Sequence, residues 1–194
     1  RVHGYEIILA TLSEFKELEI LMATARLRQF GVDGLVLLTP YDAHDIVKRL
    51  GNTLPFIMID ATADVDGTTV SIDQVEGGIM ATEHLISLGH RSILHVSGPA
   101  LWSDAELRYQ GYLAALKRQG LTPLPRYEGD WSPGSGYILV QQACAAGLTF
   151  TAVLAGNDQM ALGALKALKE AGQWSDDQEA HNNALFKRQA VLAA

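Results

Sequence analysis

Polar side chains follow several apolar segments that the sequence predicts as buried strands. Thr39 comes directly after the run GLVLL, and Asp60 comes directly after PFIMI. Asn157 follows TAVLA with one glycine between them, while Asp104 lies a few residues after SILHVS. In an open parallel sheet, ligands bind in the crevice beyond the carboxyl ends of the strands. The four side chains could therefore hydrogen-bond a polar small molecule there as it loses its water.

Two larger side chains join this candidate site. Arg108 lies one turn into a helix predicted over residues 104–120, so its guanidinium can point back to the same crevice. Trp131 lies in an irregular stretch, residues 121–136, that holds three of the six prolines. A stretch of this length suggests a function more than a simple turn. The indole could either pack against the protein or stack on a sugar ring.

Helix capping is the alternative explanation for some of these residues. Asp104 and Asn157 lie where helix N-caps belong, and capping alone accounts for a short polar side chain there. Asp60 and Arg108 are harder to explain in this way, because neither is at an obvious cap. These two residues therefore favour a binding site most strongly.

The apolar pattern predicts the elements that would position the site. Short runs that are apolar throughout are typical of strands covered on both faces, and they occur at 5–10, 34–38, 55–59, 68–72, 92–97 and 151–155. Longer stretches with a capping residue at the start and glycine at the end predict helices over 13–31, 73–89, 104–120 and 157–172. This alternation predicts an α/β fold with a doubly wound parallel sheet.

Composition excludes several classes of function. The 194 residues are nearly half apolar, which is enough to bury a core in one large domain or two small ones. The formal net charge of −7 argues against this segment binding nucleic acid or an anionic membrane by itself. No apolar run reaches the roughly 18 residues that span a bilayer. We expect no membrane partner, and the single cysteine makes a reducing cytoplasm the natural setting.

Motifs of catalysis and metal binding are scarce. Neither G-x-S-x-G nor G-x-x-x-x-G-K-[ST] occurs in the sequence. His84 and His90 are six residues apart, so a helix would place them on different faces. Cys144 lies in an apolar helical segment, where we expect an inert packing thiol. The sequence therefore predicts no enzyme activity, no metal site and no cofactor.

Four longer blocks carry a resemblance to a known family. They are EHLISLGHRSILHVSGP (83–99), LRYQGYLAALKRQGL (107–121), EGDWSPGSGY (128–137) and AGNDQMALGALKALKEAG (155–172). In this order and spacing, and with shorter agreeing segments at 32–38 and 55–60, the chain resembles the effector-binding domain of the LacI/GalR family of bacterial transcription regulators. The resemblance covers roughly residues 4–173.

The resemblance implies a fold and a binding site. The fold would be periplasmic-binding-protein-like I, with two Rossmann-like lobes whose sheets are parallel and which are incomplete at both ends of this chain. A small effector, usually a sugar, would bind in the cleft between the lobes. By position, Arg108 matches the family's effector-clamping arginine, and other cleft positions are matched by Asp60, Thr39, Asp104, Trp131 and Asn157.

The resemblance also implies lobe boundaries and partners. We expect an N-terminal lobe over 1–97, a truncated C-terminal lobe over 98–173, and a tail over 174–194 that has no family counterpart and could form a helix. A homodimer would use parts of 157–172 and 13–31. Effector binding would shift a two-state lobe arrangement and so change the affinity for operator DNA, which is gripped by a helix-turn-helix absent from this chain.

Two other functions share the predicted fold. A periplasmic sugar-binding protein that feeds a transporter is the first alternative to a sugar-responsive repressor. A signal peptide upstream would favour the transporter component, whereas a basic helix-turn-helix would favour the repressor. An enzyme is the second alternative, although no nucleophile, base or phosphate loop is visible and the fold alone does not give a function.

Overall fold

The computed structural model describes residues 4–12, 17–38, 54–59, 68–174 and 190–193. They belong to two compact units, Arg1–Ile72 and Asp73–Ala194. The lobe boundary that the resemblance implies after residue 97 stays a prediction, whereas the boundary between the compact units follows Ile72. The reason is packing: the helix and the strand that lie between these two positions pack with the second unit, as described below.

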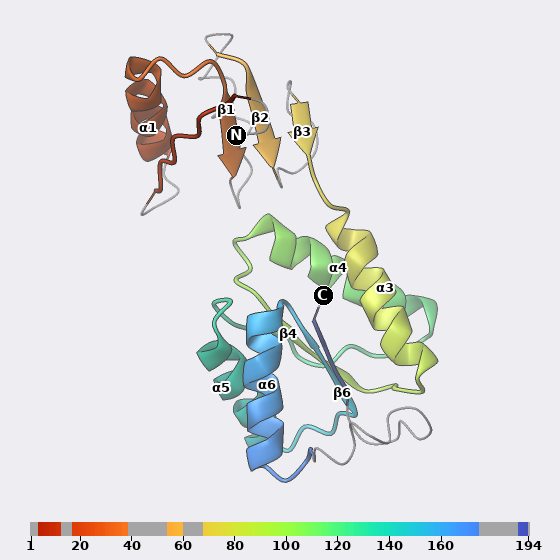
Figure 1. The fold of residues 1–194 in the computed structure, drawn as a ribbon. Coiled ribbons are helices and arrows are strands. Elements are labelled where there is room, and N and C mark those ends of the chain that lie inside the picture. Colours follow the sequence, from red (N-terminus) through yellow and green to blue (C-terminus); the bar gives the residue numbers. More distant parts are fainter. Residues whose placement is uncertain (1–3, 13–16, 39–53, 60–67, 175–189, 194) are drawn as a thin grey trace. The chain divides into compact units, whose positions relative to one another are not determined.

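The first unit contains one described helix and a small parallel sheet (Figure 1). Helix α1 spans Glu17–Gln29, and the strands are β1 (Leu35–Leu38), β2 (Phe56–Ile59) and β3 (Thr68–Val70). The sheet order is β1-β2-β3, and every pairing is parallel. Ile20 of α1 and Met58 of β2 form the buried centre of this unit. The three strand predictions over 34–38, 55–59 and 68–72 are confirmed, with shorter bounds for the first two and an earlier end for the third.

Residues 5–10 do not form the strand that the sequence predicts. They form an irregular segment without helix or strand, and Ile7 is 91% exposed. A strand is defined by hydrogen bonds to a neighbouring strand, and among the described residues this segment pairs with none. Residues 5–10 therefore have the apolar pattern of a strand but lack the hydrogen bonds to a neighbouring strand that define one.

The second unit is a four-stranded parallel sheet with helices on both faces (Figure 1). In chain order it contains α3 (Gln74–Ser87), β4 (Ile93–Ser97), α4 (Ser103–Arg118), β5 (Tyr127–Glu128), α5 (Pro133–Ala145), β6 (Ala152–Ala155), α6 (Asp158–Glu170) and β7 (Ala190–Ala193). The sheet order is β5-β4-β6-β7. This is the doubly wound parallel arrangement that the sequence predicts.

The two faces of this sheet pack against different helix pairs. Leu94 and Val153 point to the side covered by α5 and α6, where they meet Met160 and Leu168. Ile93 and its neighbours on the other face pack against α3 and α4. All five residues of β4 and all four of β6 are buried. Burial on both faces explains why these strands read as uninterrupted apolar runs in the sequence.

Glycines allow the helices of each pair to approach closely. A Cβ on Gly78 of α3 would overlap the backbone oxygen of Arg108, and one on Gly111 of α4 would overlap the backbone oxygen of Val75. On the other face, a Cβ on Gly163 of α6 would overlap the backbone oxygen of Pro133. The backbones themselves are in contact at these points, so each helix pair is held at a fixed spacing.

The end of the chain differs from the sequence prediction. Residues 190–193 form strand β7, which pairs in parallel with β6, rather than the end of a helix. An edge position beside an apolar strand favours extended backbone, and the segment AVLA is short enough for either structure. The rest of the predicted tail helix, like residues 13–16 of the first predicted helix, lies outside the described residues.

No helix in the part of the chain that the structure describes is long and apolar enough to cross a membrane.

Candidate ligand-binding site

The candidate site in the second unit lies where β4 and β6 end. Gly98 follows β4 and Gly156 follows β6, and the Gly156 N–H donates to the carbonyl of Val96 over 2.8 Å. The indole of Trp131 lies over both glycines. A Cβ on Gly98 would overlap the six-membered ring of Trp131, and one on Gly156 would lie 3.2 Å from the same ring. The Trp131 ring therefore packs directly against the backbone at the two strand ends, where glycine leaves room for it.

Trp131 is held in an unusual backbone conformation. Its φ of 71° lies in the left-handed region, and it is the only residue other than glycine with a positive φ among those described. Such conformations are costly for a bulky residue and tend to occur at functional sites. The Asn157 side-chain N–H donates to the Trp131 carbonyl over 3.1 Å, and the Gly129 N–H donates to the Ser97 carbonyl over 2.8 Å. These bonds fix the loop that carries the indole.

The turn after Trp131 is built around a carboxylate and two hydroxyls. The Ser132 N–H donates to Asp130 Oδ1 over 2.9 Å, and the Ser135 N–H donates to the Ser132 hydroxyl as the cap of α5. Hydrogen bonds from Ser132, and then from Ser135, lower the pKa of Asp130 to about 2. The carboxylate therefore remains charged at any pH where the protein would act, and it keeps the turn in shape.

Arg108 reaches the same place from the second turn of α4. Its Nε–H donates to Gln74 Oε1 over 2.8 Å, and its Nη1–H donates to the Gly156 carbonyl over 2.7 Å. The guanidinium carbon lies 5.7 Å from the centre of the Trp131 ring, within the range of a cation–π interaction. These two hydrogen bonds anchor the guanidinium at Nε and at Nη1, and together they fix its plane beside the indole.

Asn157 plays two structural roles at once. Its Oδ1 accepts from the Met160 N–H over 2.8 Å, which makes it the N-cap of α6, and its Nδ2–H group holds the Trp131 carbonyl. The capping explanation considered for this residue is therefore correct, and it does not exclude a ligand contact by the remaining N–H.

The structure brings together three of the six predicted site residues, namely Arg108, Trp131 and Asn157. Asp104 lies half-buried in the first turn of α4, four residues before Arg108 and thus on the same side of the helix. It is not the N-cap of α4, because that position belongs to Trp102. Thr39 and Asp60 lie outside the described residues, so their predicted role stays a prediction.

Several residues of this site lie outside the six predicted site residues. The ring of Trp102 meets Trp131 edge-on with their centres 5.7 Å apart, and Gln74 orients Arg108. Gly98 and Gly156 are required by the indole that lies over them. Glycine directly after a strand was a visible signal, but nothing in the sequence marked Trp131 as the partner of both glycines. Gln74 follows the helix cap Asp73 and gave no signal of its own.

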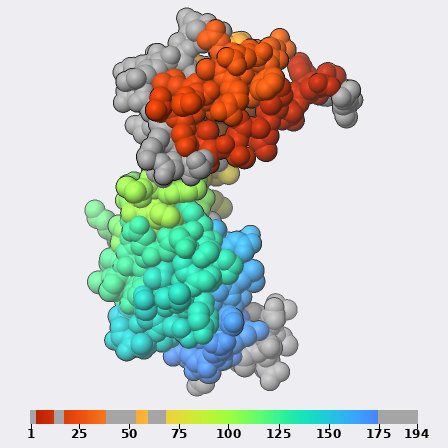
Figure 2. Space-filling view, turned by 90° about the vertical axis from the view of Figure 1, so that its left-hand side faces the viewer, coloured from red at the N-terminus to blue at the C-terminus, as the bar shows by residue number. Residues whose placement is uncertain are grey.

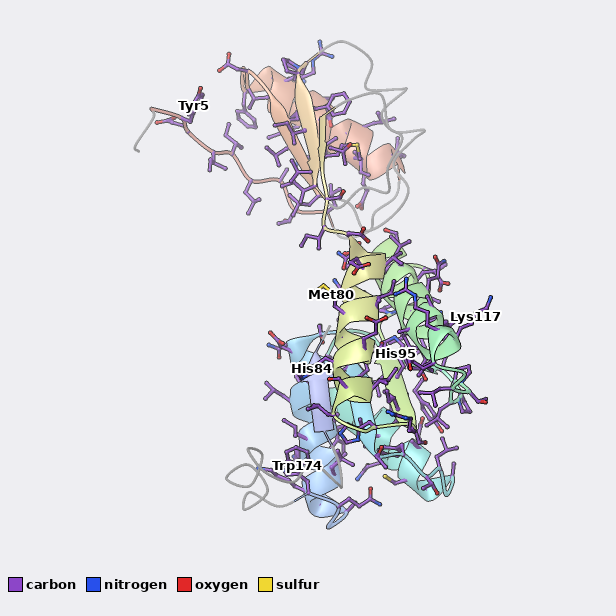
Figure 3. All side chains as sticks on the ribbon, turned by 90° about the vertical axis from the view of Figure 1, so that its right-hand side faces the viewer. Tyr5, Met80, His84, His95, Lys117 and Trp174 are labelled. Carbon is purple, nitrogen blue, oxygen red and sulfur yellow. The ribbon has the colours of Figure 1, made fainter. Side chains whose placement is uncertain are left out.

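A buried aromatic cluster lies beside the site. The His95 ring stacks on Tyr109 and Tyr112 at 5.5 Å and 5.1 Å between centres, and the Arg126 guanidinium lies 4.4 Å from the centre of the Tyr109 ring. Burial is the main reason that the pKa of His95 falls to about 4. This histidine, on the inside of the second unit (Figure 3), is therefore neutral and serves packing.

His84 and His90, for which the sequence predicts no shared metal site, lie in different environments. His84 is exposed on α3 (Figure 3). His90 is buried, with its Nδ1 3.0 Å from the Thr151 hydroxyl. Burial also raises the pKa of the Cys144 thiol, which favours its unreactive form. Over the described ranges, no group of three or more His, Cys, Asp or Glu side chains could hold a metal ion.

The doubly wound unit thus carries an arginine, an indole and an amide at its strand ends, where proteins of the α/β class commonly bind small molecules. The chain belongs to the family described as periplasmic binding proteins and the sugar-binding domain of the LacI family, whose model matches residues 1–194.

Two curated sequence relatives are operon repressors. The lactose operon repressor of Escherichia coli (strain K12) is 34% identical over 143 residues, which cover 73% of this chain and 40% of that protein. The ribose operon repressor of the same strain is 36% identical over 174 residues, covering 87% of this chain and 52% of the repressor. This chain thus spans about half the length of the curated relatives it matches.

Solved structures give the same assignment of fold. A dimeric lac repressor with an 11-residue C-terminal deletion superposes with a TM-score of 0.83 at 29% identity, over 88% of this chain and 64% of that one. The lac repressor dimer bound to operator and the anti-inducer ONPF gives a TM-score of 0.81 at 29% identity, over 88% of this chain and 60% of that one. The predicted periplasmic-binding-protein-like I fold is confirmed.

Proposed function

We propose that this chain is the effector-sensing part of a cytoplasmic transcription repressor that binds a small sugar or sugar derivative. The observation that carries the proposal is the cluster of Arg108, Trp131 and Asn157 at the carboxyl ends of β4 and β6. It occurs in a chain whose relatives include repressors of the lactose and ribose operons. A regulatory role, not an enzymatic one, follows from the same relatives.

The chemistry of the cluster suits a polyhydroxylated ligand. Gln74 and Gly156 take two of the guanidinium N–H groups of Arg108, and the others can donate to neighbouring hydroxyls of a sugar. An indole is the side chain that best covers the apolar face of a sugar ring while offering a polar N–H. The Nε1–H of Trp131 is buried and has no hydrogen-bond partner among the described residues, so a ligand hydroxyl is a suitable acceptor.

Three further residues complete the proposed effector contacts. Asp104, on the first turn of α4, supplies a carboxylate that can accept from sugar hydroxyls. Thr39 and Asp60 follow strands β1 and β2 of the first unit and were predicted on the same reasoning. Their contribution is part of the proposal and is testable by substitution.

The repressor is favoured over the periplasmic alternative because of the relatives. The family description covers both kinds of protein, but the curated relatives named here are operon repressors. We therefore propose operator DNA as the macromolecular partner, bound through a helix-turn-helix that is not part of these 194 residues. Effector binding would change operator affinity by favouring one of two conformations.

We also propose that the protein is a homodimer. A lac repressor neighbour is a dimer, and α6 presents Leu162 with 59% of its surface exposed. Helix α1 likewise exposes Leu18 and Met22. Figure 2 shows the side of the second unit to which α5 (teal) and α6 (blue) contribute. Exposed leucine and methionine on two helices are suited to a protein interface.

Sedimentation of a matched pair of variants tests the dimer. Leu162→Glu places a charge in the proposed interface and should convert a dimer at micromolar concentration into a monomer. Ile138→Glu, at an equally exposed position on α5 outside the proposed interface, should leave the dimer intact. A wild-type chain that sediments as a monomer, or equal effects of the two variants, would contradict the proposal.

Calorimetric titration tests the binding site. We expect the chain to bind at least one sugar in a panel that includes lactose and D-ribose, and Arg108→Ala to abolish that binding because it removes the fixed donors. Arg118→Ala is the matched control: it removes an exposed arginine from the same helix, where its partner is Glu83. Unchanged affinity in Arg108→Ala would show that the ligand binds elsewhere.

A further inference from the structure

Gln74 is a buried polar residue that the sequence did not mark. It is the first residue of α3, directly after the cap Asp73, and the second residue after the boundary between the two units. Only 7% of its surface is exposed. Its Oε1 accepts the Nε–H of Arg108 over 2.8 Å, although the two residues are 34 positions apart.

The frame around this hydrogen bond is rigid. Helices α3 and α4 touch through their backbones, because Gly78 lies against the carbonyl of Arg108 and Gly111 lies against the carbonyl of Val75. The backbone of Arg108 is therefore fixed relative to the first turn of α3. With both backbones fixed, the Gln74 amide sets the direction in which the arginine side chain leaves its helix.

The two anchors of Arg108 differ in what they do. The Gly156 carbonyl holds one terminal nitrogen at the strand end, and Gln74 holds the Nε side of the same plane. A single anchor would leave the guanidinium free to rotate about that bond, whereas two anchors on adjacent edges orient it. Because glutamine is uncharged, this orientation does not neutralise the arginine, which keeps its full charge for a ligand.

We propose that Gln74 is a positioning residue for effector binding, which holds Arg108 in the orientation that the effector requires. This inference rests on the proposed function, because it takes Arg108 as the effector-binding arginine. Ordering a long side chain before the ligand arrives lowers the cost of binding. Loss of the anchor should therefore weaken binding by roughly three- to tenfold without abolishing it.

A ligand-free measurement decides whether Gln74 orders Arg108. In the 194-residue chain, the Arg108 Nε–H signal in nitrogen–proton NMR, assigned by its loss in Arg108→Lys, reports solvent exchange of the hydrogen-bonded proton. Gln74→Leu should speed this exchange at least about tenfold, because the acceptor is gone. Gln74→Glu keeps the acceptor and should preserve the slow exchange. Unchanged exchange in Gln74→Leu would overturn the inference.

A control variant separates positioning from general destabilisation of α3. Thr82→Val removes a fully buried hydroxyl from the same helix, which donates its hydrogen bond to the Gly78 carbonyl and not to Arg108. It should leave the Arg108 Nε–H exchange at the wild-type rate. If Gln74→Leu does not fold, Gln74→Met removes the acceptor with a more flexible side chain and takes its place.

Titration then tests the link to the effector, with lactose and D-ribose as the probes. Gln74→Leu should raise the dissociation constant three- to tenfold, and Thr82→Val should leave it unchanged. Equal losses in Gln74→Leu and Thr82→Val would overturn the inference. If the wild type binds neither sugar, the proposed function fails for these ligands, while proton exchange still decides whether Gln74 orders Arg108.

Discussion

The substitution Gly98→Ala tests how the candidate site is built. A Cβ at this position would overlap three atoms of the six-membered ring of Trp131, while φ of Gly98 is not positive, so alanine strains no backbone. Forcing a methyl group into a packed site costs about 1–3 kcal/mol. Replacing glycine recovers about 0.4–1 kcal/mol from the unfolded chain. We expect the free energy of unfolding, measured in urea, to fall by about 1–2 kcal/mol.

A second background shows whether the indole is the cause. In Trp131→Leu the large ring is gone, so Gly98→Ala should be neutral or stabilising by up to about 1 kcal/mol. The two substitutions should thus be coupled by at least about 1 kcal/mol, which is typical of residues in direct contact. An equal loss of stability from Gly98→Ala in both backgrounds would refute the reasoning, because the glycine would then be required by something other than Trp131.

Two further predictions concern the packing around the site. Because the pKa of His95 is lowered to about 4 from 6.5, the stability that depends on its neutral form is complete above about pH 6.5 and is lost as the pH falls toward 4. Between pH 7 and pH 5 the free energy of unfolding, measured in urea, should fall by about 2 kcal/mol in the wild type and not in His95→Gln. An equal dependence of this free energy on pH in both proteins would contradict a buried neutral His95. Gly163→Ala should cost about 1–3 kcal/mol, because the added carbon overlaps the Pro133 carbonyl and lies 2.7 Å from the Tyr137 nitrogen. Gly77→Ala, in the open on α3, should instead stabilise by about 0.5–1 kcal/mol, and similar effects of the two would argue against the close α5–α6 contact.

The parts of the fold that sequence predicted well are those determined by local patterns. Strands β4 and β6 are buried on both faces and therefore appear as apolar runs. Asp73 and Asn157 cap the helices that follow them, as their residue types indicate. These features depend on a few neighbouring residues, so they are visible without knowledge of the rest of the chain.

The parts that sequence predicted poorly depend on partners far along the chain. Residues 5–10 are as apolar as a true strand, but strand formation requires a neighbour, and that requirement is not written in the segment itself. The strand at 190–193 likewise follows from its pairing with β6. None of these contacts has a local signature.

The candidate site shows the same division. Arg108 was predicted from its place one turn into a helix that follows a strand, and Trp131 from the irregular stretch that holds it and from the family resemblance. The bond from Arg108 to Gln74 and the fit of Trp131 over Gly98 join residues more than thirty positions apart. Side-chain geometry at that separation is decided by the way the helices pack, so it became visible only in the structure.

The most direct test of the account is the indole signal of Trp131 during a sugar titration. The chain has three tryptophans, and Trp131→Phe identifies the Nε1–H signal of interest in nitrogen–proton NMR. As lactose or D-ribose is added, we expect this signal to move and to saturate at the dissociation constant found by calorimetry, while the signal of Trp174 stays in place. Heat of binding without a change at Trp131, or no binding of any sugar in the panel, would contradict the central claim.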